Sequence, residues 1–225
     1  MAAQRASAPD CSVGAYYIAH GDLDRALRAL EGARGGRGDL SEANLRGLTL
    51  LLADRKEEAR VQFEAILARD GDHVPARFNR GLTLLRLGDA PGAIEDFTTV
   101  WESNETQLKA SAAFHIALAE QSRGRLEEAE KWLLDAVKVD PAYADAHLVR
   151  GTILERMRRF EDAGRAYLDV LALQPRSVIA TLRFGVSAWR AGFRDTAVDY
   201  LRRVESMAPG SREALEAQKY LLIVE

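Results

Sequence analysis

The chain has 225 residues and contains little cysteine and little proline: one Cys and six Pro. The single cysteine, Cys11, excludes a disulfide framework within the chain. No apolar run reaches the length of a membrane-spanning helix, and the N-terminus lacks a signal-peptide core. We therefore expect no membrane span and a cytoplasmic protein. If a leader is removed ahead of Met1, the expectation changes to a periplasmic or lipid-anchored protein.

Residue patterns for catalysis or metal binding are also missing. The four histidines show no metal-ligand spacing on a shared helix face: His20, His73, His115 and His147. The glycine-rich segment 35–38 has no strand before it, so it does not predict a phosphate loop. A net charge of −3 leaves no electrostatic footprint for nucleic acid. We expect no catalytic residues, no metal, no cofactor and no enzymatic activity.

What the chain does have is an internal period of 33 to 36 residues, marked by six alanines: Ala26, Ala59, Ala93, Ala129, Ala163 and Ala197. Twelve residues before each alanine stands a small residue: Gly14, Gly47, Gly81, Ala117, Gly151 or Gly185. Four residues after each alanine stands a large one: Leu30, Phe63, Phe97, Leu133, Tyr167 or Leu201. Hydrophobic residues make up 47% of the chain, enough to bury a continuous core. A period of this length predicts stacked helical hairpins.

Each periodic residue type has a physical role in such a hairpin. The small pair allows the two helices to approach closely, and the Phe, Tyr or Leu fills the wedge between them and the next pair. Pro141, Pro175 and Pro209 end the second helix of the later units. Gly and Asp in the segment before each alanine suit a helix C-cap followed by the N-cap of the next helix.

This pattern resembles the tetratricopeptide repeat, a 34-residue helix–turn–helix unit. The resemblance implies an all-α fold, a solenoid in which antiparallel helix hairpins form a right-handed superhelix. It divides the chain into a flexible tail at 1–6, six repeats within 7–211 and a capping helix at 212–225. The expected repeats span 7–39, 40–73, 74–107, 110–143, 144–177 and 178–211. Ser211 should start the cap, and the residues covering the last hairpin should be Ala214, Leu215, Tyr220 and Leu221.

The resemblance also implies where a partner binds. In this family the first helix of every hairpin lines the concave side of the superhelix. Carried over by position, the predicted partner-binding groove contains Asn44, Leu48, Phe78, Asn79, Leu82, Arg86, Phe114, His115, Leu118, Arg156, Leu182, Arg183, Val186, Trp189 and Arg190. Its middle rungs are apolar and its C-terminal end carries arginines. Packing between neighbouring helices is the alternative role for the leucines, and pairing with nearby carboxylates is the alternative for the arginines.

The predicted partner is another protein, offering a peptide or helix with apolar and acidic residues. The resemblance does not extend to the repeats that clamp chaperone C-terminal tails, because only Asn79 matches their pattern and a carboxylate clamp needs several cationic donors.

Three functional hypotheses remain. The first is a scaffold or adaptor that holds a partner segment during assembly of a larger complex. The second is a bacterial envelope assembly protein resembling the pilotins that help secretins assemble in pilus systems. The third is a scaffold that forms homo-oligomers by binding a terminus of a neighbouring copy.

Overall fold

The computed structural model describes residues 11–224 and divides into two compact units, residues 1–108 and 109–225. The expected tail at 1–6 and the start of the first repeat lie outside the described residues. Unit 1 contains α1 (Cys11–Ala19), α2 (Leu23–Ala29), the 3-10 helix η1 (Glu31–Gly36), α3 (Leu40–Leu52), α4 (Lys56–Arg69), α5 (Val74–Leu87) and α6 (Ala90–Glu102). Its core includes Leu50, Phe63 and Ile66, which are fully buried.

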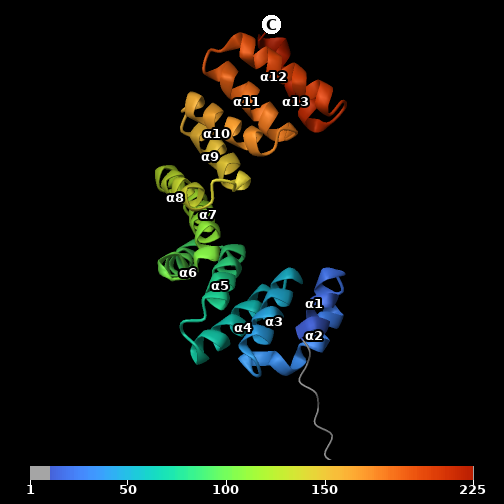
Figure 1. The fold of residues 1–225 in the computed structure, drawn as a ribbon, viewed down its shortest axis with the longest axis vertical. Helices are drawn as coiled ribbons and strands as arrows, with labels where there is room; N and C mark the ends of the chain where they lie inside the picture. Colours follow the sequence, from blue (N-terminus) through green and yellow to red (C-terminus); the bar gives the residue numbers. More distant parts are fainter. Residues whose placement is uncertain (1–10, 225) are drawn as a thin grey trace, which may run out of the picture. The chain divides into compact units, whose positions relative to one another are not determined.

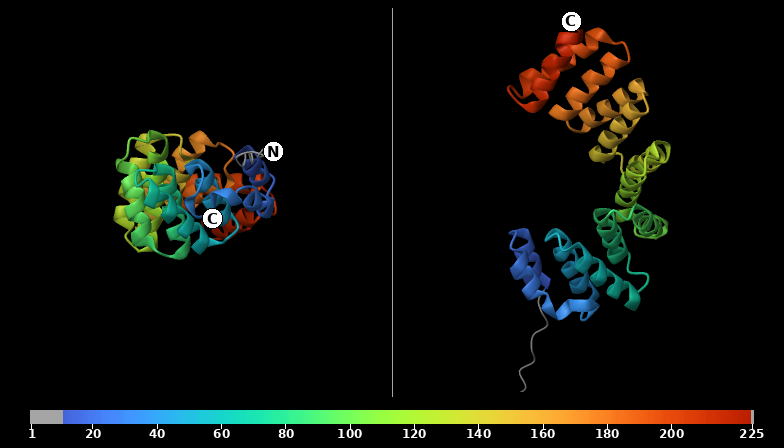
Figure 2. Two further views of the ribbon diagram at one scale, coloured as in Figure 1. Left: turned by 90° about the horizontal axis from the view of Figure 1, so that it is seen from below. Right: turned by 180° about the vertical axis from the view of Figure 1, so that it is seen from behind.

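Unit 2 is likewise built from antiparallel helices in chain order. It contains most of α7 (Thr106–Ser122), then α8 (Leu126–Val139), α9 (Ala144–Arg156), α10 (Phe160–Leu173), α11 (Val178–Arg190), α12 (Arg194–Met207) and α13 (Arg212–Val224). Figure 1 shows α9 to α13 stacked as neighbours, and the right-hand view of Figure 2 shows the same order from behind.

The expected helix hairpins are confirmed. Residues 11–224 contain thirteen α-helices and no strand, which corresponds to six hairpins and a capping helix. All six periodic alanines are fully buried, as expected for small residues at a helix crossing. The fold is therefore all-α, a stacked array of hairpins of the tetratricopeptide type. The residue limits of the six repeats stay a prediction.

One turn geometry joins the two helices of every hairpin. The residue five positions before each periodic alanine has a positive φ: Gly21, Asp54, Gly88, Gly124, Arg158 and Gly192. The residue after it donates its backbone N–H to a carbonyl five positions back, at 2.8–2.9 Å. This bond closes the C-terminus of the first helix. Since L side chains are strained at positive φ, Asp54 and Arg158 carry a conformational cost in their turns.

The predicted N-caps are confirmed where an aspartate occupies the N-cap position itself. The side chains of Asp22 and Asp89 accept the backbone N–H groups of Arg25 and Gly92 at the start of α2 and α6. In the other four hairpins the N-cap residue is arginine or phenylalanine and makes no such bond. The backbone hydrogen bond is therefore common to all six turns, whereas the aspartate side-chain cap is present in two of them.

The periodic glycines make room for the large side chain of their own hairpin. A Cβ added at Gly47 would lie 2.5 Å from the Phe63 ring, and one at Gly81 would lie 2.9 Å from the Phe97 ring. Both rings are fully buried. The wedge side chain therefore packs against the glycine of its own hairpin, and the core cluster that contains Phe63 also includes Ala76 and Leu82 of the next hairpin.

The first hairpin departs from the expected pattern. Its second helix, α2, has only seven residues and is followed by η1, whereas α4, α8, α10 and α12 each have fourteen. The segment contains Gly32, Gly35, Gly36 and Gly38. Glycine disfavours a continuing α-helix by about 1 kcal/mol per residue relative to alanine, which explains the early end.

The capping helix forms as predicted, with one correction. The Ser211 hydroxyl accepts the N–H of Ala214 at 3.1 Å, and α13 follows. Ala214 and Leu221 are buried and Tyr220 packs against the core. Leu215, however, is 54% exposed. It lies next to the buried stripe of Ala214, Ala217, Leu221 and Val224 instead of within it, so it does not cover the last hairpin.

Candidate functional site

The predicted groove residues of unit 1 lie on the first helices α3 and α5. Leu48, Phe78 and Leu82 are half-buried, and the Phe78 ring lies 5.4 Å from Phe97 in an edge-on contact. The polar members are tied into the fold. Asn79 Nδ2 donates to Asn44 Oδ1 at 3.0 Å. Arg86, which is exposed, donates to the backbone carbonyl of Leu51 at 3.0 Å. These bonds join α3 to α5.

In unit 2 the predicted rungs begin on α7. Phe114, His115 and Leu118 are half-buried. The Phe114 ring lies 5.0 Å from that of Tyr143 and 5.3 Å from that of His115. Burial lowers the pKa of His115 to about 4, so its imidazole is neutral at physiological pH. The side chain therefore contributes a neutral imidazole ring here instead of a positive charge.

Two predicted residues of α11 do not reach the surface. Leu182 and Val186 are 0% and 1% exposed and belong to the core beside α12 and α13. A partner cannot touch them, and we remove them from the predicted surface. Trp189 is half-buried, with its ring 5.5 Å from Tyr220 of the capping helix.

The predicted arginines of unit 2 differ in their surroundings. Arg183 Nη1 lies 3.7 Å from Glu155 Oε2, and the same carboxylate accepts the Ser187 hydroxyl at 2.9 Å. The Arg190 guanidinium lies over the Phe160 ring, 5.6 Å from its centroid. Arg156 is exposed and forms no ion pair with the described residues. Arg156 and Arg190 are thus open to an acidic partner, while Arg183 already has a carboxylate.

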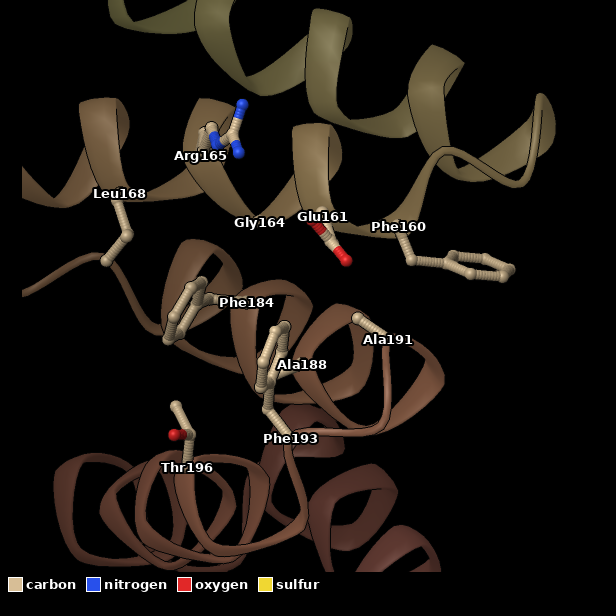
Figure 3. Close-up of a pocket in the computed structure, with 10 residues that line it drawn as sticks. All are labelled: Phe160, Glu161, Gly164, Arg165, Leu168, Phe184, Ala188, Ala191, Phe193 and Thr196. Atoms are coloured by element: carbon tan, nitrogen blue, oxygen red, sulfur yellow. The ribbon is translucent and has the colours of Figure 1, made fainter.

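A cleft that contains none of these predicted residues opens between α10, α11 and the start of α12 (Figure 3). Its volume is about 290 Å³. We call it the aromatic cleft, and its lining residues are Phe160, Glu161, Gly164, Arg165, Leu168, Phe184, Ala188, Ala191, Phe193 and Thr196. The Phe184 ring forms an edge-on contact with Tyr200, 4.4 Å away, which fixes one wall.

The cleft exists because α10 carries a glycine inside the helix. A Cβ added at Gly164 would lie 3.5 Å from the Phe184 ring, so any larger side chain would extend into the cleft. The position that follows the periodic alanine has a side chain in the other five hairpins: Leu27, Arg60, Ile94, Glu130 and Val198. A glycine inside a helix costs about 1 kcal/mol relative to alanine, and this one keeps an apolar surface open.

Phe193 is the most exposed aromatic wall of the cleft. It occupies the N-cap position of α12 and is 53% exposed. At the equivalent positions of other hairpins, Asp22 caps α2 and Asp89 caps α6. Leu168 on the opposite wall is 41% exposed. An aromatic residue at a cap position forgoes a stabilising hydrogen bond of about 1 kcal/mol. Phe193 at a cap position and Gly164 inside a helix are the two sequence signals for this cleft, and the predicted groove includes neither residue.

Charge is distributed unevenly around the cleft. In Figure 3, Glu161 points from α10 into the cleft, while Arg165 points away from it. Glu161 forms no ion pair with the described residues, whereas Arg165 lies 3.4 Å from Asp162. The carboxylates of Glu161 and Asp162 both stand in the first turn of α10, where they complement the helix dipole. Arg158, in its strained turn, is exposed and lies beside Phe160 and Glu161.

No three His, Cys, Asp or Glu side chains in the described part of the chain are placed to hold a metal ion. None of the helices between residues 11 and 224 is long and apolar enough to cross a bilayer.

Comparison with known proteins agrees with the hairpin architecture. A family model for the tetratricopeptide repeat matches residues 44–100, 78–147 and 114–178. PilW, a widely conserved type IV pilus biogenesis factor, is similar with a TM-score of 0.81 and 16% identity, over 92% of this chain and 96% of PilW. The pilF protein of Pseudomonas aeruginosa is similar with a TM-score of 0.78 and 16% identity, over 93% and 95%. YrrB, a TPR protein with an unusual peptide-binding site, has a TM-score of 0.66 and 17% identity, over 85% and 96%. Identities this low show a shared fold alone.

Proposed function

The chain belongs to the tetratricopeptide repeat family, and from that premise we propose that this protein-interaction scaffold is an adaptor holding a large apolar side chain of a partner protein in the aromatic cleft. One observation carries the proposal: the cleft keeps apolar walls open to solvent, with Phe193 at 53% and Leu168 at 41% exposure. Exposed apolar surface in a concave site is favourable to cover, and buried aromatic anchors commonly dominate protein interfaces.

Exposed arginines of unit 2 favour a partner segment with acidic residues. Arg158 lies beside Phe160 and Glu161, and the Arg190 guanidinium lies over the Phe160 ring. Arg156, on α9, is also exposed, and neither Arg156 nor Arg158 forms an ion pair with the described residues. The apolar anchor would supply most of the affinity, while the arginines would fix the direction of the segment and speed encounter. Among the residues that line the cleft, Glu161 is the acidic one, and it points into the cleft. It makes a cationic or neutral residue of the partner preferable at that single position.

The first-helix face remains a second proposed contact surface, described separately in each unit. Phe78 and Leu82 in unit 1, and Phe114 and Leu118 in unit 2, are half-buried, so part of each side chain is available to a partner. Their contacts with Phe97 and Tyr143 also serve the fold. An adaptor could therefore hold one segment in the cleft and additional residues on either face.

The experiment compares the two surfaces with one partner. Affinity capture and cross-linking identify the partner, a peptide array maps its bound segment, and fluorescence anisotropy measures its Kd. Gly164→Leu fills the cleft and Phe193→Ser removes one wall. Each should weaken binding about tenfold or more, corresponding to about 1.4 kcal/mol. Leu222→Ser, which changes an 86% exposed leucine in the same unit, is the matched control and should leave the Kd unchanged.

The face variants complete the comparison. The double variant Phe78→Ala with Phe114→Ala should also weaken binding tenfold or more if the first-helix face contributes. Arg183→Glu with Arg190→Glu should mainly slow association and reduce its salt dependence. Normal binding by both cleft variants would overturn the cleft as the site. Normal binding by the face variants as well would place the partner on other helices or loops.

Two alternative functions come from the same architecture. The similarity to PilW and pilF supports the proposal of an envelope assembly protein resembling a pilotin; the partner would then be a secretin subunit, and any other captured partner counts against it. A homo-oligomeric scaffold is the other alternative. Light scattering across a hundredfold range of protein concentration tests it, because a constant monomer mass excludes self-association over that range.

A further inference from the structure

Unit 1 contains a buried arginine whose positive charge is poorly matched. Arg46 of α3 is 6% exposed. Its Nη1 donates to Gln62 Oε1 at a long 3.4 Å, and its Nη2 lies 3.8 Å from Glu31 Oε2. The Nε group has no hydrogen-bond partner among the described residues. A buried guanidinium normally requires short hydrogen bonds to an anion, because taking its charge out of water is costly.

The next hairpin has a carboxylate at the position of Gln62. Arg80 precedes Gly81 as Arg46 precedes Gly47, and Asp96 stands where Gln62 stands. Arg80 forms a bidentate ion pair with Asp96: Nε lies 2.8 Å from Oδ2 and Nη2 lies 2.6 Å from Oδ1. In the Arg46 hairpin a neutral amide replaces that carboxylate. The Gln62 amide is also held in place, since its Nε2 donates to the Ala43 carbonyl at 3.2 Å.

Arg46 also lies at the wall of an open cleft. This second cleft, about 320 Å³ in volume, is lined by Arg34, Arg46, Glu57, Glu58, Arg60, Val61 and Gln62. The acidic residues around it are engaged: Glu58 pairs with Arg55 at 2.6 Å and Glu57 with Arg60 at 3.0 Å. Val61 is 55% exposed and offers apolar contact beside the guanidinium. The cleft thus joins a buried cation to the surface.

We propose that this cleft is a carboxylate slot, in which Arg46 binds an acidic side chain of a partner protein in the manner that Arg80 binds Asp96. The planar guanidinium matches a carboxylate through two parallel hydrogen bonds. Arg46 directly precedes the close-packed Gly47 on α3 and lies outside the predicted first-helix face. The slot does not depend on the aromatic cleft, which lies in unit 2.

The test follows the Arg46 Nε–H resonance in nitrogen-labelled full-length protein, identified by its loss in Arg46→Lys. The probe is N-acetylglutamate, titrated at constant ionic strength into the millimolar range. N-acetylglutamine α-methylamide, which has no carboxylate, is the neutral control. We expect N-acetylglutamate to shift the Arg46 resonance with saturation and to leave the Arg80 resonance unchanged, and N-acetylglutamine α-methylamide to shift neither. Inorganic phosphate serves as a third arm, and a shift larger than that of N-acetylglutamate would overturn a carboxylate slot in favour of a phosphate site.

Two variants exchange the partners of Arg46 and Arg80, one gaining an internal carboxylate and the other losing it. Gln62→Glu supplies an internal carboxylate and should abolish the response of Arg46. Asp96→Asn removes the partner of Arg80 and should make its resonance sensitive to N-acetylglutamate, provided that circular dichroism shows native helix content. Absence of an Arg46 shift in the unmodified protein, or an unchanged response in Gln62→Glu, would overturn the proposal whether or not Asp96→Asn folds.

Discussion

Two neighbouring junctions of unit 2 use the same pair of repeat positions for opposite purposes. Between α8 and α9, Arg150 Nη2 lies 3.7 Å from Glu130 Oε1, and Arg159 Nη1 donates to Glu130 Oε2 at 2.6 Å. Between α10 and α11, the corresponding residues are Phe184 and Gly164, with Phe184 next to the open aromatic cleft. The α8–α9 junction, which we call the closed junction, is filled by ion pairs. The α10–α11 junction, which we call the open junction, contains the apolar walls of the aromatic cleft.

The difference teaches that the repeat sets which positions of adjacent helices face each other. The side chains at those positions determine whether the contact is an internal ion pair or an accessible apolar surface. Both junctions have a fully buried alanine in the preceding position, Ala129 and Ala163. The helices are therefore placed by the same small residues in each. Replacing an ion pair by a ring and a glycine changes an internal contact into a surface that a partner can cover.

The largest expected effect separates two adjacent residues of α10. Ala163→Leu should lower the free energy of unfolding by about 1–3 kcal/mol, because the fully buried crossing has no room for it. Ala129→Leu should do the same at the closed junction. Gly164→Leu should cost little or raise stability, since its side chain enters the cleft and a helical glycine is removed. Urea unfolding followed by circular dichroism measures all three, and an equal loss for Gly164→Leu would show that the junction is closed.

A smaller effect is expected from neutralising the acid of the closed junction. Glu130→Gln should lower the free energy of unfolding by about 1–2 kcal/mol, because Arg150 and Arg159 lose a largely buried carboxylate. Glu161→Gln, at the open junction, is the matched control and should change stability by less than about 0.5 kcal/mol. Equal effects of the two variants in the same unfolding assay would remove the contrast between the junctions.

The strained turn between the two junctions offers a gain in stability. Arg158 has φ +61°, and glycine adopts this conformation without strain. Arg158→Gly should raise the free energy of unfolding by about 0.5 kcal/mol, the strain relief being partly offset by greater freedom of the unfolded chain. Asp54→Gly should gain less, because aspartate tolerates this region better. Thermal unfolding of both variants checks the order, and a loss of stability in Arg158→Gly would contradict it.

The smallest effect concerns the charge inside the open cleft. If the partner segment is acidic, Glu161→Gln should tighten binding about twofold, because it neutralises the carboxylate that points into the cleft. The anisotropy assay with the mapped segment measures this, with Glu213→Gln on α13 as a control of equal charge change. Weaker binding would instead assign a basic residue of the partner to Glu161.

Much of the fold could be predicted from sequence because its determinants are local. The six alanines located the hairpins, Gly and Asp located the turns, and Ser211 located the start of α13. The candidate site could be predicted only in part. The period did not predict the aromatic cleft, because Gly164 and Phe193 differ from the residues at the equivalent positions of the other repeats.

The sequence by itself determined a hairpin array, since the 34-residue period of small and large residues recurs regardless of which partners surround each copy. Only the tertiary structure decided which apolar residues stay accessible. Leu182 and Val186 are buried in the core beside α12 and α13, while Leu168 and Phe193 are exposed to solvent. The physical reason is that burial depends on the side chains that neighbouring helices bring to the same place, and Gly164, four residues before Leu168, leaves that place unfilled.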